Sequence, residues 1–381
     1  MTGPLHGCRV LDLGIITAGA ATSALLADLG AEVIKVESST YRDPFRIWSS
    51  RDPNDAAGGM PPYFRATNRN KVGISIDLKK DEGREVFLRL AGQSDIVVEN
   101  FRRGVLDRLK LGYPVLESAK PGIILASISS QGETGPDAGY VSYGTTLEAV
   151  AGLAWRTGYA GDEPVVSGRD LNYPDQVAAI FAAGMIVTAW RSRLETGTGS
   201  HLDLSQRELT SFLSGEAFAD PDEETPRQGN AQPPHHYLQE CFRAADGVWV
   251  AVTVDGDQVA SLDRAVPGTG APEARLRTWV AGRSAQQGAD DLTAAGIAAA
   301  VVLDGTGMMA HAGNLWSTAM LRLDEGALVK GFPFQLDAMP LRIVRDAPKA
   351  GADTAEVLAR VGGYSEAEIA DFAGRGVIEI A

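Results

Sequence analysis

A lone carboxylate, Asp175, stands where a polar stretch gives way to a long apolar run, within the segment YPDQVAAIFAAGMIVTAW (173–190). Aspartate is a common residue at the start of a helix, where its side chain caps exposed N–H groups. The same N–H groups and the helix dipole also keep a carboxylate ionised, as a nucleophile must be. Asp170, five residues upstream, is a rival acid. The pattern alone leaves a cap and a nucleophile as alternatives.

The apolar run after Asp175 predicts a helix that is buried on most sides, because its apolar residues fall on most of the helix surface. Arg191 and Arg193 follow near its end, where the dipole favours cations.

Other chemistries find no support in the residue spacing. The five histidines, His6, His201, His235, His236 and His311, lack metal-binding spacing and are interpreted as surface or packing residues. No G-x-S-x-G elbow is present, so a serine triad is not expected. Cys8 opens an apolar stretch and is predicted to lie in the core. We therefore expect no metal site and no serine or cysteine nucleophile.

Strands and helices alternate in the N-terminal part of the chain, which predicts an α/β fold with a doubly wound parallel sheet. The loop at residues 14–19 is neither a dinucleotide fingerprint nor a phosphate loop. It nevertheless follows the first strand, at the edge of the sheet where ligands usually bind. The expected strands are residues 8–14, 31–37, 71–78, 94–101 and 121–130, and the expected helices are residues 20–30 and 81–91.

The length of 381 residues predicts two domains. An acidic, proline-containing stretch at residues 216–227 is interpreted as a linker. Residues 228–316 are expected to form a small domain, in which HHYLQECFRAADGVWVAVTV predicts a hairpin that turns at Asp246–Gly247. Near the end of the chain, two helical patterns are separated by Gly362–Gly363.

The net charge of −14 argues against binding to nucleic acid or to an anionic membrane. No apolar run is long enough for a membrane span, the N-terminus does not resemble a secretory signal, and two cysteines are too few for a disulfide framework. These features predict a cytoplasmic protein. Four local basic clusters are expected to be mostly solvated: Arg69 and Lys71, Lys79 and Lys80, Arg102 and Arg103, and Arg108 and Lys110.

Eight segments, taken together and in this order, resemble the family III CoA-transferases, a group that also includes the α-methylacyl-CoA racemases. They span nearly the whole chain, and their specificity comes from their number and order. The segments are RVLDLGIITAGAATSALLADLGAEVIKVE, NRNKVGISIDLKKDEG, VVENFRRGVLDRLKLGY, ILASISSQGETGP, YGTTLEAVAGLAWRTGY, YPDQVAAIFAAGMIVTAWRSRLETGTGSHLDLS, HHYLQECFRAADGVWVAV and APKAGADTAEVLA.

The resemblance implies a Rossmann-like large domain, made of residues 1–215 and the C-terminal part of residues 317–381, with a smaller α+β domain between them. It also implies an interlocked, ring-like homodimer, and it leaves open a heteromer with a paralogous subunit. The substrates that it implies are an acyl-CoA and a small carboxylic acid, with no tightly bound cofactor.

By the same resemblance, Asp175 is the nucleophile that carries aspartyl-CoA thioester and mixed-anhydride intermediates. Arg108 is the expected phosphate partner, because a planar guanidinium suits phosphate. The coenzyme A contacts that the resemblance implies are Ile16, Thr17, Ala18, Ile76, Leu78, Lys79, Asn100, Phe101 and Arg108.

The chain departs from the family pattern at three places. Ser38 and Val141 stand where some members carry arginine and lysine, and the glycine-rich loop of some members is reduced to VDGDQ, with Gly256 as its one glycine. The segment GYVSYGTTLEA lacks the histidine that racemases pair with the aspartate. CoA transfer is therefore favoured, with a racemase or epimerase, or a non-catalytic subunit of a heteromeric transferase, as alternatives. The acyl donor and the acceptor acid are not readable from the sequence.

Overall fold

The computed structural model describes residues 3–48, 60–158, 163–167, 171–218, 236–310, 320–323, 327–332, 336–339 and 341–381. The chain divides into two compact units. The larger unit consists of Met1–Thr157, Glu163–Pro226 and Ser317–Ala381, and the smaller one of Gly158–Asp162 and Arg227–Trp316. Most of the predicted linker, residues 216–227, lies outside the described residues, so the predicted domain boundaries stay a prediction.

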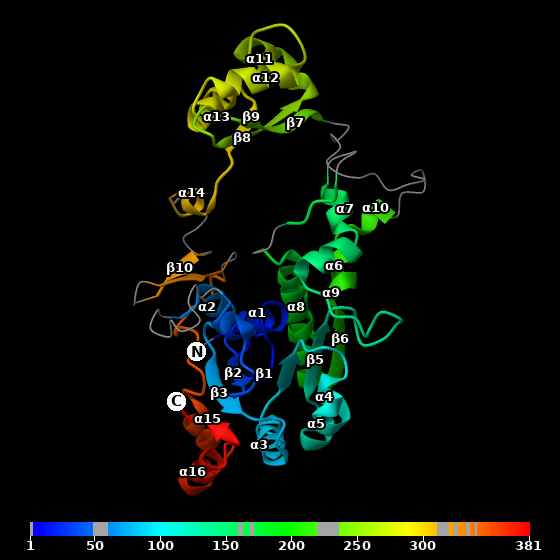
Figure 1. The fold of residues 1–381 in the computed structure, drawn as a ribbon, viewed down its shortest axis with the longest axis vertical. Coiled ribbons are helices and arrows are strands. Elements are labelled where there is room, and N and C mark those ends of the chain that lie inside the picture. The colour runs from blue at the N-terminus through cyan, green and yellow to red at the C-terminus, as the bar shows by residue number, and fades with distance from the viewer. Residues whose placement is uncertain are drawn as a thin grey trace. The chain divides into compact units, whose positions relative to one another are not determined.

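The larger unit is built on a seven-stranded sheet in the order β12-β3-β2-β1-β4-β5-β6. Figure 1 labels β1, β2, β3, β5 and β6 of this sheet. All neighbouring strands are parallel except β12, which pairs antiparallel with β3. The predicted α/β fold with a parallel central sheet is therefore confirmed. The strands are β1 (Arg9–Asp12), β2 (Glu32–Glu37), β3 (Val72–Ile76), β4 (Ile96–Glu99), β5 (Ile124–Ser129), β6 (Ser200–Ser205) and β12 (Ile378–Glu379).

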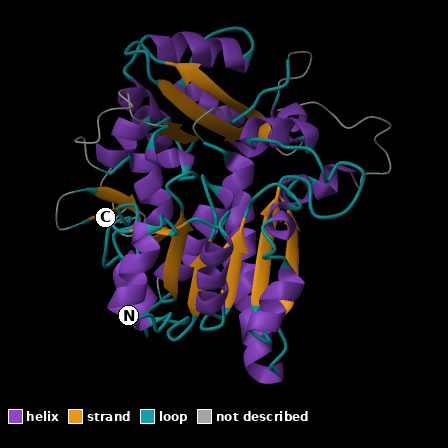
Figure 2. Cartoon of the chain, turned by 60° about the horizontal axis from the view of Figure 1, so that its bottom comes forward, coloured by secondary structure: helices purple, strands orange, loops and turns teal. Residues whose placement is uncertain are grey.

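Helices pack beside the strands of this sheet (Figure 2). One core cluster joins the sheet to residues of α3, α5, α15 and α16, and a second joins it to α1 and α8. The helices of this unit are α1 (Ala18–Asp28), α2 (Pro62–Asn68), α3 (Asp81–Ala91), α4 (Val105–Arg108), α5 (Tyr113–Ala119), α6 (Gly144–Val150), α7 (Leu153–Thr157), α8 (Tyr173–Thr196), α9 (Gln206–Phe212), α10 (Gly215–Phe218), α15 (Thr354–Arg360) and α16 (Glu366–Gly374), with the 3₁₀ turn η1 (Pro44–Arg46) and the short strands β10 (Met320–Arg322) and β11 (Leu328–Lys330).

The sequence predicted the inner strands of the sheet better than its edges. The five expected strands all form, and the helix expected at residues 81–91 forms with those bounds. The edge strand β6 was not predicted, because its short sequence SHLDLS is mostly polar and contains no apolar run, and its first half is partly exposed. Inner parallel strands are buried on both faces and appear as continuous apolar runs, which are easier to recognise.

Helix α8 differs from the prediction that it is buried on most sides. Its small residues Ala178 and Ala182 are buried in the core, whereas Ile180 is 65% exposed and Met185 46% exposed. Among the described residues it is the one helix long and apolar enough to cross a membrane, a test that core helices also pass. The predicted absence of membrane contact and the cytoplasmic location stay predictions.

The smaller unit contains an antiparallel sheet in the order β7-β8-β9 (Figure 1). The predicted hairpin is confirmed, and Gly247 takes a positive φ of 81° in its turn. Phe242, Val252 and Leu276 lie in the core of this unit. Its elements are β7 (His236–Arg243), β8 (Trp249–Asp255), η2 (Gly256–Gln258), α11 (Val259–Ala265), α12 (Pro272–Ala281), α13 (Ala285–Ala294), β9 (Ala298–Val301) and α14 (Gly305–Ala310).

Candidate active site

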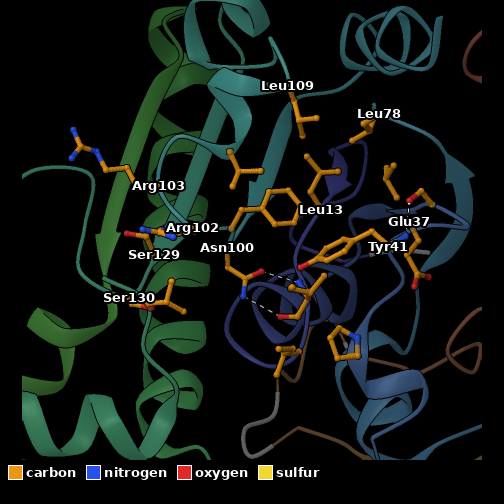
Figure 3. A pocket seen from close by; sticks show the side chains of 18 of the residues that line it. Leu13, Glu37, Tyr41, Leu78, Asn100, Arg102, Arg103, Leu109, Ser129 and Ser130 are labelled. Atoms are coloured by element: carbon orange, nitrogen blue, oxygen red, sulfur yellow. Dashed lines mark hydrogen bonds between the residues drawn. The ribbon is translucent and has the colours of Figure 1, made fainter. Parts of the chain in front are cut away.

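A pocket of about 510 Å³ opens in the larger unit, at the carboxyl ends of the parallel strands (Figure 3). This is where open α/β sheets usually bind their ligands. Figure 3 shows Leu13, Leu78 and Leu109 on one side, with Ser129 and Arg102 on the other. Its lining comprises Leu13, Ile15, Ile16, Val36, Glu37, Ser38, Tyr41, Pro44, Ile76, Asp77, Leu78, Lys79, Asn100, Phe101, Arg102, Arg103, Val105, Leu109, Ser129, Ser130, Ala138, Tyr140, Val141, Ser142, Tyr143, Asp175 and Gln206.

Asp175 lines this pocket from the first turn of α8. Asn172, in a left-handed conformation, holds the N-cap position, so Asp175 is not the cap residue. Burial raises the pKa of the Asp175 carboxyl group from 3.8 to about 6, and the backbone N–H groups of Asp175 itself and of Ala18, the first residue of α1, lower this pKa in part. Asp175 is thus mostly ionised at neutral pH. Asp170 lies outside the described residues.

Gly144, the first residue of α6, makes room for this carboxyl group. A Cβ atom added to Gly144 would lie 3.2 Å from Oδ2 of Asp175 and 3.1 Å from Oδ1 of Asn172. Such contacts are tighter than ordinary van der Waals separation, so a side chain here would push against the carboxyl group. The absence of a side chain at Gly144 therefore helps to set the position of Asp175.

The loop between β1 and α1 is held by side chains from three other parts of the chain. The Asn100 amide accepts from the Ile15 N–H at 2.8 Å and donates to the Ile15 carbonyl at 3.0 Å. Asp43 accepts from the Ile16 N–H at 3.1 Å, and Lys35 donates to the Gly14 carbonyl. Ile16 has a φ of 59°, an unfavourable conformation for a β-branched residue that persists only where its surroundings enforce it.

Behind the loop lies a fully buried set of charges. The Lys71 ammonium lies 2.7 Å from Asp12, and Lys35 lies 2.9 Å from Asp43, with all four side chains fully buried. Asp12 also accepts from the Gly14 N–H at 2.8 Å. The prediction that Lys71 and its neighbour Arg69 are solvated is wrong, since Arg69 is also buried and pairs with an aspartate. Single-residue patterns could not show this, because the partners lie far apart in sequence.

Residues 5–354 match the model of CoA-transferase family III. The chain belongs to this family. Among its relatives, an acyl-CoA transferase of Fusarium pseudograminearum is 36% identical over 68% of this chain and 58% of its own length. The alpha subunit of a succinyl-CoA–L-malate CoA-transferase of Chloroflexus aurantiacus is 32% identical, over 67% of this chain and 59% of that subunit. The chain thus spans less than two thirds of the length of these curated relatives.

A solved structure of a CAIB/BAIF family protein from Brucella suis has the same fold. It superimposes with a TM-score of 0.85 at 24% identity, over 95% of this chain and all of the other. A second neighbour, a hypothetical protein from Mycobacterium tuberculosis, has a TM-score of 0.76 at 22% identity, over 93% of this chain and 99% of the other.

Most of the residues that the family resemblance implied lie at the pocket. Thr17 and Ala18 are buried and are not among its lining residues, although the N–H of Ala18 lowers the pKa of Asp175. The lining residues among those implied are Ile16, Ile76, Leu78, Lys79, Asn100, Phe101 and Asp175.

The structure does not bring Arg108 to this pocket. Arg108 is exposed on α4 and is not among the lining residues, whereas Arg102 and Arg103 are. Arg102 also donates to the Gly139 carbonyl at 2.7 Å, which ties the loop over residues 130–143 to the pocket edge. Both arginines follow the end of β4 closely, and this position could have identified them from the sequence as pocket residues.

Among the residues that the structure describes, no group of three or more His, Cys, Asp or Glu side chains could hold a metal ion. Within the same residues, His201 bonds Ser127 at 2.9 Å and stacks on Tyr113, which fits the interpretation as a packing residue. Cys8 is buried, as predicted, and burial raises the pKa of its thiol to about 12.

Proposed function

We propose that this chain is a CoA-transferase that moves CoA from an acyl-CoA donor to a carboxylic acid acceptor, with Asp175 as nucleophile. One observation carries the proposal: Asp175 lines the pocket from the start of α8, beside Gly144 and with a pKa of about 6. Such a group is mostly ionised at neutral pH. Family membership supports the reaction class.

Covalent catalysis replaces one difficult exchange by several easier steps. The Asp175 carboxylate attacks the thioester carbon and expels CoA thiolate, leaving an aspartyl mixed anhydride. The thiolate attacks the aspartyl carbonyl of the anhydride, so the donor acid leaves and an aspartyl-CoA thioester remains. The acceptor carboxylate then attacks this thioester, forming a second anhydride and releasing CoA thiolate. Attack of the thiolate on the acceptor acyl carbon yields the new acyl-CoA and restores Asp175.

The volume and lining of the pocket support binding of a ligand with apolar and anionic parts, as a CoA thioester has. Its volume of about 510 Å³ lies within the range of about 300–1,000 Å³ typical of small-molecule sites. Apolar side chains such as Leu13 and Phe101 suit the adenine ring and pantetheine arm, and Lys79, Arg102 and Arg103 supply positive charge for the phosphates. No tightly bound cofactor is needed by this chemistry.

The relatives indicate the class of acid to test. Their names include succinyl-CoA–D-citramalate CoA-transferase, acetyl-CoA:oxalate CoA-transferase and succinate–glutarate CoA-transferase. All of these contain a dicarboxylic acid. We therefore take succinyl-CoA as the first donor and short dicarboxylic acids as the first acceptors.

Two alternatives make different predictions. A racemase of this family needs a histidine beside the aspartate, and no histidine is among the described residues that line the pocket. A non-catalytic subunit needs no aspartate, yet Asp175 is present and faces the pocket. The name of one relative includes an alpha subunit, so a heteromer with a paralogous chain is the version of this alternative worth testing.

The test is intact-mass spectrometry after incubation with succinyl-CoA. We expect a covalent adduct on the wild-type chain that maps to Asp175, and neither adduct nor turnover with Asp175→Ala. A folded Asp175→Ala variant that turns over at more than a few per cent of the wild-type rate would contradict the proposal. Transfer that appears only after addition of a paralogous chain would support the heteromer.

We also propose that two chains assemble as the interlocked, ring-like homodimer of the family. Support comes from α8, whose side chains Ile180 and Met185 are largely exposed in a single chain. Exposed apolar patches on a helix commonly mark an interface. Sedimentation should find a dimer, Ile180→Glu should weaken it, and Ser118→Glu at an exposed polar position of α5, away from this face of α8, serves as the control. A stable folded monomer of the wild type at low micromolar concentration would refute the dimer.

A further inference from the structure

A buried carboxylate on α6, Glu148, anchors the chain segment that leads to Asp175. Glu148 is only 1% exposed. One of its oxygens accepts from the Ser167 N–H at 2.7 Å, and the other accepts from the Ser167 hydroxyl at 2.5 Å. Burying a carboxylate is costly unless hydrogen bonds compensate it. Both hydrogen bonds that Glu148 makes within the described residues thus go to Ser167, which stands eight positions before Asp175.

The same short helix contacts both the nucleophile and its lead-in segment. Gly144 and Glu148 stand four residues apart on α6, so they share one face of the helix. Gly144 lies against the carboxyl group of Asp175, and Glu148 holds Ser167. A shift of α6 relative to Ser167 would thus move Gly144 against the carboxyl group of Asp175.

Residues 163–167 have a second attachment at Val165, which is farther from Asp175 in the sequence than Ser167 is. The Val165 N–H donates to the Ala154 carbonyl at 3.0 Å, and the Thr157 hydroxyl donates to the Val165 carbonyl at 2.7 Å. Both partners belong to α7. Residues 163–167 are therefore attached by hydrogen bonds to two helices, α6 through Glu148 and α7 through Ala154 and Thr157. Only α6 also carries Gly144, the residue that lies against Asp175.

We propose that Glu148 is a positioning residue for the nucleophile: its hydrogen bonds to Ser167 fix α6, and Gly144 on α6 holds the Asp175 carboxylate at the angle and distance needed for attack on the thioester. This inference rests on the proposed function, because it takes Asp175 as the nucleophile. Glu148 itself touches neither the substrate nor the reacting atoms. A misplacement of about 1 Å at a reacting group costs on the order of 100-fold in rate.

The test compares Glu148→Ala, Glu148→Gln, Ser167→Ala and the control Thr157→Val. For each, the rate of adduct formation on Asp175 from succinyl-CoA is measured in a single turnover, together with kcat, KM and the melting temperature. We expect Glu148→Ala to slow adduct formation by about 10- to 100-fold with KM changed by less than about threefold. Glu148→Gln should recover most of the rate, since its amide bonds Ser167 through both polar atoms. Ser167→Ala should lie between them, and Thr157→Val should keep the wild-type rate.

A structural role alone would give another pattern. If Thr157→Val lowers the rate as much as Glu148→Ala does, or if folded Glu148→Ala reacts within twofold of the wild type, the inference is wrong. Should Glu148→Ala fail to fold, Ser167→Ala and Glu148→Gln decide by the same criterion. The wild-type adduct separates the two proposals: its absence refutes the proposed function and this inference together, whereas an Asp175 adduct with unaffected variants refutes only the inference.

Discussion

The two sides of the pocket are built in opposite ways. On the side of Asp175, the loop between β1 and α1 is fixed by the buried side chains of Asp12 and Asp43 and by the partly buried Asn100. On the other side, Arg102 and Arg103 are exposed. Groups that react need fixed geometry, because rate falls steeply with misplacement. Groups that attract phosphate work over longer distances and tolerate motion.

The two sides also differ in the free energy of desolvation that folding must overcome. The buried pair of Lys71 and Asp12 must overcome the desolvation of two full charges. The exposed arginines keep most of their hydration until a ligand arrives. Changes behind the loop should therefore act mainly on stability, and changes at the exposed arginines mainly on substrate binding.

The largest effect is expected from Asp12→Asn. This variant keeps an acceptor for the Gly14 N–H but leaves the buried Lys71 ammonium without its counter-charge. Removing one partner of a buried pair costs roughly 3–5 kcal/mol. Urea unfolding at pH 7 measures this loss in the free energy of unfolding. The control is Glu195→Gln, which removes an exposed i,i+4 pair with Arg191 and should cost less than about 1 kcal/mol.

A second variant tests whether the uncompensated charge is the cause. Adding Lys71→Met to Asp12→Asn removes the charge itself, so part of the lost stability should return. A loss below about 1 kcal/mol for Asp12→Asn, or a further loss in the double variant equal to the first, would show that the pair does not stabilise the loop.

A smaller effect is expected at the exposed side. Arg102→Ala should raise KM for succinyl-CoA about tenfold with a smaller change in kcat, the pattern of lost uniform binding. Arg108→Ala serves as the matched control and should stay within about twofold, because Arg108 does not line the pocket. Steady-state rates with an acyl-pantetheine, which lacks the nucleotide, should show little effect of Arg102→Ala. A larger increase in KM for Arg108→Ala than for Arg102→Ala would restore Arg108 as the phosphate partner, as assigned from the sequence.

These two regions also show what the sequence could predict. The inner strands and the helix at residues 81–91 follow from apolar runs and periodicity, which are local properties. Asp175 was singled out because its position before an apolar helix is local too, and the family resemblance, not the pattern, favoured a nucleophile over a cap. Its burial and its contact with Gly144 depend on a segment about thirty residues away, and no local pattern encodes that contact.

The charges behind the loop could not be predicted for the same reason. Lys71 and its partner Asp12 are 59 residues apart, and a lysine after an arginine and an asparagine has the local pattern of a solvated turn. Arg108 was assigned through the family resemblance and its position after the β4 strand end, whereas Arg102, which stands nearer to that strand end, lines the pocket. A rule that weighs residues directly after strand ends would have selected the arginine that lines the pocket.

The smallest expected effect is a gain of stability on the reactive side. Burial raises the pKa of Asp175 from 3.8 to about 6, so the folded chain binds this proton more tightly than the unfolded chain does. The stabilisation from the protonated carboxyl group is complete below about pH 4 and is lost as the pH rises through about 6. Asp175→Asn removes the charge with little change of shape. It should therefore raise stability at pH 7.5 by about 1 kcal/mol, a value reduced for the partial exposure of Asp175 to the pocket.

Thermal unfolding at two pH values measures this gain. The melting temperature of Asp175→Asn should exceed that of the wild type by about 2–4 °C at pH 7.5, and the difference should shrink toward zero near pH 4. Asp107→Asn, at an exposed carboxylate on α4, is the control and should show no such pH-dependent gain. Loss of activity with higher stability is the signature of a charge kept in an unfavourable place for function. Equal or lower stability of Asp175→Asn at pH 7.5 would mean that the carboxylate serves the fold, as a helix cap does, and the distinction drawn between the two sides of the pocket would fail.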